Sequence, residues 1–179
     1  KNPNIKEALI LSTCNRTEVY AVTLDCTRGE LALQDWFRAH EAFSPMQSDM
    51  LYAYTDRAAI AHLFAVASGL DSMIVGEFEI LGQVREAYLA AAEKKMIGVV
   101  FHQLFKDAIR VGKRARSETE IGAGATSVAY AAVALARRHL GDLTGRRALV
   151  IGAGEMARRV AKNLAQDGMC MVVVANRTN

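Results

Sequence analysis

Hydrophobic and polar positions along the first thirty residues follow the pattern of a β-hairpin. Ala8–Leu11 is an apolar run, and Glu18–Leu24 is a second run with β-branched and aromatic side chains. The connecting residues 12–17 are polar and include a cysteine. We therefore expect two paired strands that present a cysteine-containing loop.

After this hairpin, apolar residues recur at intervals of three and four, which is the spacing of amphipathic helices. The segments with this spacing are 31–43, 56–70, 77–96 and 99–116. A hairpin followed by helices predicts an α+β fold. Glycines become dense at 121–125, and we place a domain boundary there, which divides the chain into residues 1–120 and 121–179.

The second of these domains has the pattern of a β-α-β unit. Thr126 or Ser127 can cap an alanine-rich linker helix that ends at Gly141. An apolar strand at 148–151, a glycine-rich turn, a further helix and an apolar strand at 171–175 follow. We expect the first half of an α/β Rossmann-like domain.

The turn in this unit reads Gly152-x-Gly154-x-x-Ala157 and stands between a strand and a helix. The first glycine permits a tight turn, and the second lets the backbone approach a pyrophosphate. The small third residue lets helix and strand pack closely, with the phosphates at the helix N-terminus. A dinucleotide site is the favoured interpretation, and a purely structural turn is the alternative.

The end of the second strand bears on which dinucleotide binds. It reads Asn176-Arg177-Thr178, where NAD-binding units usually carry an acidic residue for the ribose. A guanidinium and a hydroxyl suit a 2′-phosphate. The sequence therefore favours NADP over NAD.

Composition restricts the class of protein further. The chain has 179 residues, 51% of them hydrophobic and 23% charged, with a formal net charge of +3. These values are typical of a globular protein and exclude a collagen, a coiled coil or a disordered chain. No apolar run reaches the ~18 residues that cross a bilayer. We expect a cytoplasmic protein with reduced thiols. We also expect a fragment, because the chain lacks an initiating Met and stops directly after an expected strand.

Cys14 carries the most reactive chemistry in the hairpin loop. A thiol close to a guanidinium, here that of Arg16, and to loop amides is favoured in its nucleophilic thiolate form. On the residues alone, the alternative is that Cys14 is an inert loop cysteine. Cys26 and Cys170 have no polar constellation around them in the sequence, and we expect structural roles for both.

Several segments together resemble the glutamyl-tRNA reductase family. They are Leu11–Tyr20 (LSTCNRTEVY), Ala67–Glu77 (ASGLDSMIVGE), Ile80–Val84 (ILGQV), Gly112–Arg116 (GKRAR), the Gly152 turn and Asn176–Thr178. The resemblance holds in order and spacing over nearly the whole chain. It implies that residues 1–120 form a catalytic domain that binds glutamyl-tRNA, and that residues 121–179 hold a linker helix and part of an NADPH-binding domain.

The resemblance also implies a reaction. In this family a cysteine thiolate attacks the ester of glutamyl-tRNA and holds the glutamate as a thioester, which NADPH reduces to glutamate-1-semialdehyde. This product is the first committed precursor of tetrapyrroles such as haem. Cys14 matches the nucleophile, and Thr13 and Arg16 match positions that bind the glutamyl group. Ser72 and Glu77 match further positions of the substrate pocket.

Two more residues acquire expected roles from the resemblance. His62 matches the histidine that the family places near the thiol, to activate it or to assist proton transfer to the leaving tRNA oxygen. It lies about 140° from the centre of the apolar face of its helix, so it faces solvent or a cleft, and a surface histidine is the alternative. Glu79 stands at a substrate-pocket position where the family usually has Gln, so its carboxylate would add negative charge beside the ligand.

The family further implies a homodimer formed through a C-terminal region that the chain lacks, and transfer of the product to glutamate-1-semialdehyde aminotransferase. A basic stripe on the predicted helix 99–116 either contacts tRNA phosphates or faces solvent. It consists of Lys106, Arg110, Lys113 and Arg114. No residues stand at metal-ligand spacing, so we expect no metal.

Three functions remain open on the residues alone. The first is a cysteine-dependent, NADPH-linked reductase of an aminoacyl-tRNA. The second is a nucleotide-binding regulatory module with an incidental loop thiol, and the third is a cysteine hydrolase that uses the nucleotide fold only as a scaffold. Loss of activity on alkylation of Cys14 separates the second from the others, and NADPH dependence separates the first from the third.

Overall fold

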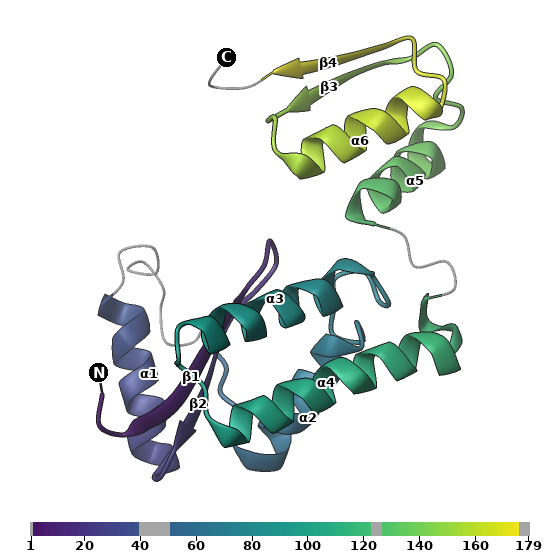
Figure 1. The fold of residues 1–179 in the computed structure, drawn as a ribbon. Coiled ribbons are helices and arrows are strands. Elements are labelled where there is room, and N and C mark those ends of the chain that lie inside the picture. Colours follow the sequence, from purple (N-terminus) through teal and green to yellow (C-terminus); the bar gives the residue numbers. More distant parts are fainter. Residues whose placement is uncertain (1, 40–50, 123–126, 176–179) are drawn as a thin grey trace. The chain divides into compact units, whose positions relative to one another are not determined.

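The computed structural model describes residues 2–39, 51–122 and 127–175 (Figure 1). The chain divides into two compact units, Lys1–Ala123 and Gly124–Asn179, which are described separately. None of the described helices has the length and apolar character needed to span a membrane.

The first unit begins with the expected hairpin. Strands β1 (Ile5–Ser12) and β2 (Thr17–Thr23) pair antiparallel, with Ser12 opposite Thr17. Leu9 and Leu11 are buried and Ile10 between them is exposed, which is the two-residue alternation of a half-buried strand. The four loop residues 13–16 are therefore presented at one end of the hairpin.

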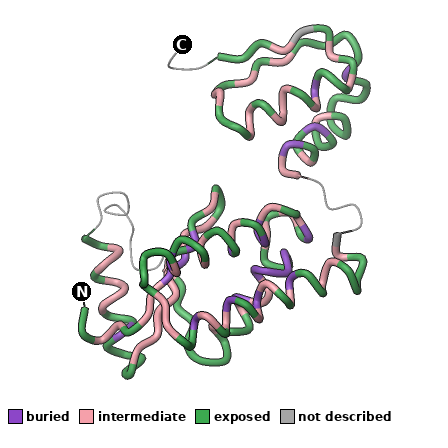
Figure 2. Tube along the Cα trace, in the orientation of Figure 1, coloured by how far each residue is buried: buried purple, intermediate pink, exposed green. Residues whose placement is uncertain are grey.

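Four helices follow the hairpin in this unit. They are α1 (Cys26–Ala39), α2 (Asp56–Ala67), α3 (Glu79–Glu93) and α4 (Val99–Glu118), followed by the short helix η3 (Glu120–Gly122). Helix α1 packs on β2 and α3 on β1, while α2, α3 and α4 pack against one another (Figure 1). Leu63, Val84 and Phe105 are fully buried between these elements. Figure 2 shows the buried residues of the chain in purple. The unit is a helix-rich α+β fold.

Several helix ends differ from the expected ones: α3 spans 79–93 instead of 77–96, α4 ends at Glu118 instead of residue 116, and two further ends have a clear local cause. Helix α1 begins at Cys26 instead of residue 31, because the Asp25 carboxylate accepts a hydrogen bond from the Arg28 amide and caps the first turn. Helix α2 ends at Ala67 instead of residue 70, because Gly69 adopts a positive φ of 76° that closes the helix. The expected end of the first helix, residues 40–43, lies outside the described residues.

Helices α2 and α4 are in close contact at Gly112. A Cβ added to this glycine would lie 2.4 Å from the Ala67 carbonyl oxygen, a backbone atom that cannot move aside.

We expect Gly112→Ala to lower the free energy of unfolding by about 1–3 kcal/mol, despite the better helix propensity of alanine. Chemical denaturation checks this. Gly82→Ala in α3 is the matched control, since nothing lies within 4 Å of the added Cβ, and a neutral or stabilising effect is expected there. Equal effects at both positions would contradict the close-packing explanation.

The second unit contains α5 (Val128–Leu140), β3 (Arg147–Ile151), α6 (Glu155–Gln166) and β4 (Met171–Ala175). Strands β3 and β4 are parallel and α6 connects them, so the expected β-α-β unit is present. The Ser127 side chain caps α5 by accepting a hydrogen bond from the Tyr130 amide, and Gly141 ends that helix with a φ of 75°. Val133, Leu143 and Leu164 form the core of the unit.

Candidate active site

Cys14 occupies the tip of the hairpin loop, and a side chain next to it shapes that loop. The Thr13 hydroxyl accepts hydrogen bonds from the Asn15 amide (3.2 Å) and the Arg16 amide (3.1 Å), and the Thr13 amide donates to the Arg16 carbonyl (2.8 Å). These bonds close a tight turn around Cys14. The Cys14 thiol is free and exposed, so a large substrate can reach it.

The buried carboxylate of Glu18 lies beside this turn and is surrounded by hydrogen-bond donors from other side chains. Arg16 Nη1 (3.0 Å), Tyr20 Oη (2.5 Å), Tyr52 Oη (2.7 Å) and His62 Nε2 (2.9 Å) all lie within hydrogen-bond distance of its oxygens. The Glu18 side chain is only 6% exposed. A charge removed from water to this extent is stable only when it is hydrogen-bonded in this way.

The electrostatics of these groups follow from burial and from the shared carboxylate. Burial alone would raise the pKa of Glu18, but the hydrogen bonds from Tyr20, Tyr52 and His62 outweigh it and hold that pKa below its ordinary value. Burial and the charge of Glu18 raise the pKa of Tyr20, and burial and the hydrogen bond to Glu18 raise the pKa of Tyr52. Both phenols therefore stay protonated and act as donors.

His62 is part of this cluster and not a surface histidine. The His62 side chain is 14% exposed. Its Nε2 lies 2.9 Å from a carboxylate oxygen of Glu18, and its Nδ1 lies 3.7 Å from the Asp71 carboxylate. The rings of Tyr52 and Tyr54 lie against it, at centroid distances of 5.7 and 4.9 Å. An ionised Glu18 can only accept, so Nε2 carries the hydrogen and Nδ1 is the nitrogen left to exchange a proton.

Arg16 bridges the hairpin to the segment after α2. Its Nη1 contacts both Glu18 and Asp71 Oδ2 at 3.0 Å, and its Nη2 donates to the Asp71 carbonyl. Burial lowers the pKa of Arg16, but the hydrogen bond and charge of Asp71 and the charge of Glu18 outweigh burial and raise it. The guanidinium thus holds two protein carboxylates, which leaves only part of its donor set for a ligand.

The expected substrate residues 72–79 lie in and just after the loop between α2 and α3. Ser72 is half-buried and follows Asp71 directly. The Glu77 carboxylate accepts hydrogen bonds from the amides of Glu79 and Ile80, both at 3.0 Å, so it caps α3. Glu79 is half-buried in the first turn of that helix.

Another arginine anchors this loop to α4. Arg116 donates to the carbonyls of Glu77 (2.9 Å) and Phe78 (3.1 Å), and its guanidinium lies 5.5 Å from the centroid of the Phe78 ring. Burial lowers the pKa of Arg116. The start of α3 is therefore fixed from both sides, by the Glu77 cap and by Arg116.

In the second unit, the glycine turn has the geometry that a phosphate site needs. Gly152 has a φ of 111°, which favours glycine, and Gly154 is the N-cap of α6 with no side-chain cap. A Cβ added to either glycine would meet nothing within 4 Å, so the helix N-terminus is open. The residues present fit the diphosphate of a dinucleotide. Asn176, Arg177 and Thr178 lie outside the described residues.

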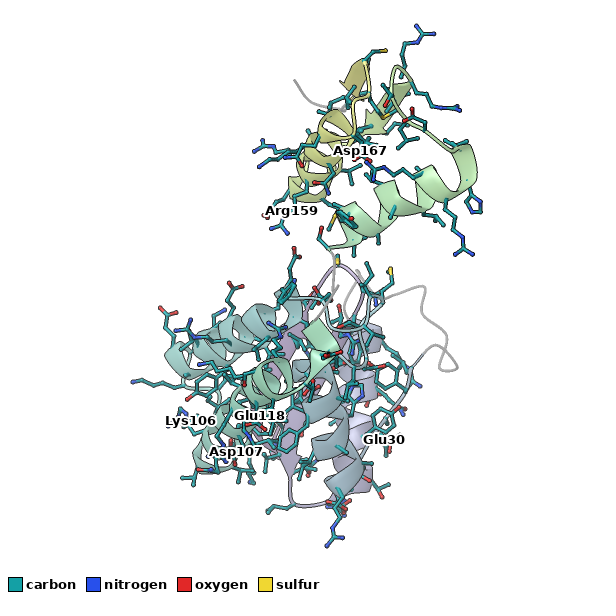
Figure 3. The ribbon with its side chains drawn as sticks, turned by 90° about the vertical axis from the view of Figure 1, so that its right-hand side faces the viewer. Glu30, Lys106, Asp107, Glu118, Arg159 and Asp167 are labelled. Carbon is teal, nitrogen blue, oxygen red and sulfur yellow. The ribbon has the colours of Figure 1, made fainter. Side chains whose placement is uncertain are left out.

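The remaining candidates carry less chemistry. Cys26 and Cys170 are exposed free cysteines, and the Cys170 thiol donates to the Gly145 carbonyl at 3.0 Å. On α4 all four basic residues of the stripe are exposed. Figure 3 labels one of them, Lys106, together with Asp107 and Glu118 of the same helix. Arg110 pairs with Asp107 and Arg114 with Glu118, which is the pattern of a solvated helix face.

Among the described residues, no group of three or more His, Cys, Asp or Glu side chains is placed to hold a metal ion.

Sequence reasoning gave no role to Glu18, Asp71, Tyr52 or Tyr54. One signal for Glu18 was available, because it alternates with Tyr20 and Val22, which face the core in β2. A charged residue on the inward face of a strand indicates a buried network. No comparable signal marked the two tyrosines.

Comparison with known proteins agrees with this architecture. The model of the glutamyl-tRNAGlu reductase N-terminal domain matches residues 1–119, and that of the shikimate/quinate 5-dehydrogenases matches residues 134–179. The glutamyl-tRNA reductase of Bacillus subtilis is 47% identical over 98% of this chain and 39% of its own length. That of Pelotomaculum thermopropionicum is 49% identical over 98% of this chain and 40% of its own.

A solved structure shows the same similarity. The glutamyl-tRNA reductase from Methanopyrus kandleri aligns with a TM-score of 0.59 and 44% identity, over 97% of this chain and 41% of that one. The first unit thus has the fold of a reductase N-terminal domain, joined to the start of a dehydrogenase-like domain. The chain belongs to the glutamyl-tRNA reductase family. It spans about two fifths of the length of the curated relatives it matches.

Proposed function

We propose that this chain supplies the thiol, the substrate pocket and part of the NADPH site of an enzyme that reduces glutamyl-tRNA to glutamate-1-semialdehyde, in the first step of tetrapyrrole biosynthesis. The observation that carries the proposal is that the exposed Cys14 thiol lies on the same turn as Arg16. Arg16 and His62 both contact the Glu18 carboxylate. It supports covalent chemistry at a site with one proton-exchanging group, which a regulatory nucleotide module does not need.

The chemistry of the first step follows from these residues. The Cys14 sulfur attacks the carbonyl carbon of the glutamyl ester, a carbon–sulfur bond forms, and the bond to the ribose oxygen of the tRNA breaks. Nδ1 of His62 takes the proton of the Cys14 thiol and passes it to that leaving oxygen, while Glu18 holds Nε2 and fixes the ring. The product of this step is a thioester on Cys14.

Arg16, Thr13 and Ser72 are the proposed contacts to the glutamyl group. Arg16 retains donors beyond those it gives to Glu18 and Asp71, and these suit the side-chain carboxylate of the substrate. The Asp71 carboxylate is 54% exposed and suits the substrate ammonium group. Glu77 acts by capping α3, and with Glu79 it places negative charge at the edge of the pocket.

The glycine turn of the second unit is the proposed pyrophosphate site of NADPH, which when bound supplies the hydride that reduces the thioester. Gly152 and Gly154 leave the N-terminus of α6 open for the phosphates. We assign Asn176, Arg177 and Thr178 to the 2′-phosphate from the sequence. The proposal also includes domain bounds of 1–120 and 121–179, a cytoplasmic location, a homodimer and product transfer to an aminotransferase.

The specificity for NADPH has a direct test at Arg177. Arg177→Ala is expected to weaken NADPH binding roughly ten- to a hundredfold, since a charged hydrogen bond is worth about 1.5–3 kcal/mol. NADH lacks the 2′-phosphate, so its binding should hardly change. Titration of both cofactors into the complete polypeptide measures the ratio. Equal weakening of both would assign Arg177 to the fold.

The activity itself is tested by incubating the complete polypeptide with glutamyl-tRNA, with and without NADPH. Semialdehyde that forms only with NADPH supports the reductase. Hydrolysis of glutamyl-tRNA with no NADPH-dependent product would instead favour a cysteine hydrolase.

A further inference from the structure

Two exposed tyrosines lie against the largely buried His62 side chain. Tyr52 and Tyr54 precede α2, and they are 57% and 51% exposed, whereas the His62 side chain is 14% exposed. Their ring centroids are 5.7 and 4.9 Å from that of His62. Aromatic rings that stay exposed beside a buried polar cluster are well placed to contact a ligand.

The cluster also holds these rings in position before any ligand arrives. The Tyr52 hydroxyl donates to Glu18 at 2.7 Å, and the Tyr54 ring lies tilted by 36° over the His62 ring. A ring fixed in this way loses little conformational freedom when a ligand stacks on it. The two tyrosines therefore form a rigid aromatic surface at one side of His62.

We propose that Tyr52 and Tyr54 bind the base of the 3′-terminal adenosine of the aminoacyl-tRNA. This inference rests on the proposed function, in which His62 gives a proton to the ribose oxygen that leaves the glutamyl ester. That oxygen and the terminal base belong to the same nucleoside. A ribose at His62 therefore places its base within reach of the rings that contact His62.

The chemistry of the surface favours a base over a phosphate. Both tyrosines are uncharged, and the carboxylates of Glu18 and Asp71 in the same cluster repel a phosphate. Stacking on an aromatic ring needs only a flat π-face, which every base has. The tRNA phosphates would then be bound elsewhere.

The spacing of the rings decides how the base lies. Their centroids are 5.5 Å apart with an interplanar angle of 48°. A base held between two rings needs about 7 Å, twice the usual contact distance of about 3.5 Å. The base therefore stacks on the outer face of one ring, and the other ring supports its edge.

The test compares two glutamylated tRNAs that differ in one group. One has the normal 3′-terminal adenosine, and the other has a terminal nucleotide without its base. The measurement is the rate of glutamyl transfer to Cys14 in the complete polypeptide under single-turnover conditions, at subsaturating tRNA. The parent protein is expected to prefer the intact tRNA by about tenfold or more. Tyr54→Ala is expected to lose most of that preference, because transfer from the intact tRNA slows more than transfer from the baseless tRNA.

Tyr54 is the cleaner position to vary, because Tyr52 also donates to Glu18. Tyr54→Phe keeps the ring and is expected to restore the preference for the intact tRNA. Tyr130→Ala, at a tyrosine of the second unit with a similar exposure of 52%, is the matched control and should leave the preference unchanged.

Three results would overturn the inference. They are a parent protein that does not distinguish the two tRNAs, a Tyr54→Ala variant that slows both equally, and a Tyr54→Ala variant that keeps the preference, as expected if another protein segment covers the ring. A parent protein that forms no adduct at Cys14 with either tRNA is a different result, because it overturns the proposed function and the inference with it.

Discussion

Cys14→Ser is expected to abolish both the NADPH-dependent reduction and any NADPH-independent hydrolysis of glutamyl-tRNA. Both reactions pass through the thioester, and a serine hydroxyl is barely ionised at neutral pH. We expect the rate to fall by about 10⁴-fold or more, as when other enzymes lose their nucleophile. Release of free tRNA and formation of semialdehyde, followed on the same samples, measure the two reactions.

The controls for this variant come from the chain itself. The Cys14 side chain is exposed, so its replacement should leave the thermal unfolding temperature unchanged. Cys26→Ser and Cys170→Ser should keep both reactions. If Cys14→Ser retained either reaction at a rate near that of the parent protein, the nucleophile would have to be a different group.

Glu18→Gln is expected to have the second-largest effect, on stability and activity together. The amide removes the charge that pairs with Arg16, and it points an N–H group at one of the donors around it. Breaking a buried ion pair in this way costs about 3–5 kcal/mol of the free energy of unfolding. His62 also loses the acceptor that fixes its ring, so glutamyl transfer to Cys14 should slow even at a temperature where the variant is folded.

The pH dependence of stability separates the charge of Glu18 from its shape. The pKa of Glu18 is lowered in the folded protein, so its contribution is present above the ordinary value of 4.5 and is lost as pH falls through the lower folded value. The difference in unfolding free energy between the parent protein and Glu18→Gln should therefore shrink below about pH 4.5. Glu30→Gln, at an exposed position of α1, should change stability by less than about 0.5 kcal/mol. A difference that stays constant down to low pH would contradict the role of the charge.

The elements that the sequence predicted well are those that local periodicity determines. The hairpin follows from two apolar runs, Ala8–Leu11 and Glu18–Leu24, with a polar loop between them, and the β-α-β unit follows from two apolar strands on either side of Gly152. Helix ends were less accurate, because they depend on single caps. Asp25 starts α1 and Gly69 ends α2, and both effects act within one turn, where apolar spacing carries no information.

The site was only partly predictable for a different reason. Thr13, Cys14 and Arg16 are local to one loop, so a motif can reveal them. The hydrogen bonds of Glu18 join residues that lie far apart in the chain, since Tyr52 and His62 come from segments outside the hairpin. The partners of such a buried charge are set by tertiary packing, and a sequence pattern cannot identify them.

Glu77 shows how one residue type can serve two purposes. The resemblance placed it in the substrate pocket, while the structure shows its carboxylate on the first amides of α3. A carboxylate just before a helix can accept hydrogen bonds from the first free amides, and this local role accounts for the contacts of Glu77 without a ligand. Its contact with substrate remains a prediction.

Mapping the covalent adduct tests the central claim most directly. The complete polypeptide is incubated with tRNA that carries labelled glutamate, without NADPH, then quenched in acid and digested, and the label is located by mass spectrometry. We predict label on the peptide that contains Cys14, in a bond that hydroxylamine cleaves as it does thioesters. Label on Cys26 or Cys170 with an unmodified Cys14, or turnover of glutamyl-tRNA with no cysteine labelled, would contradict the account.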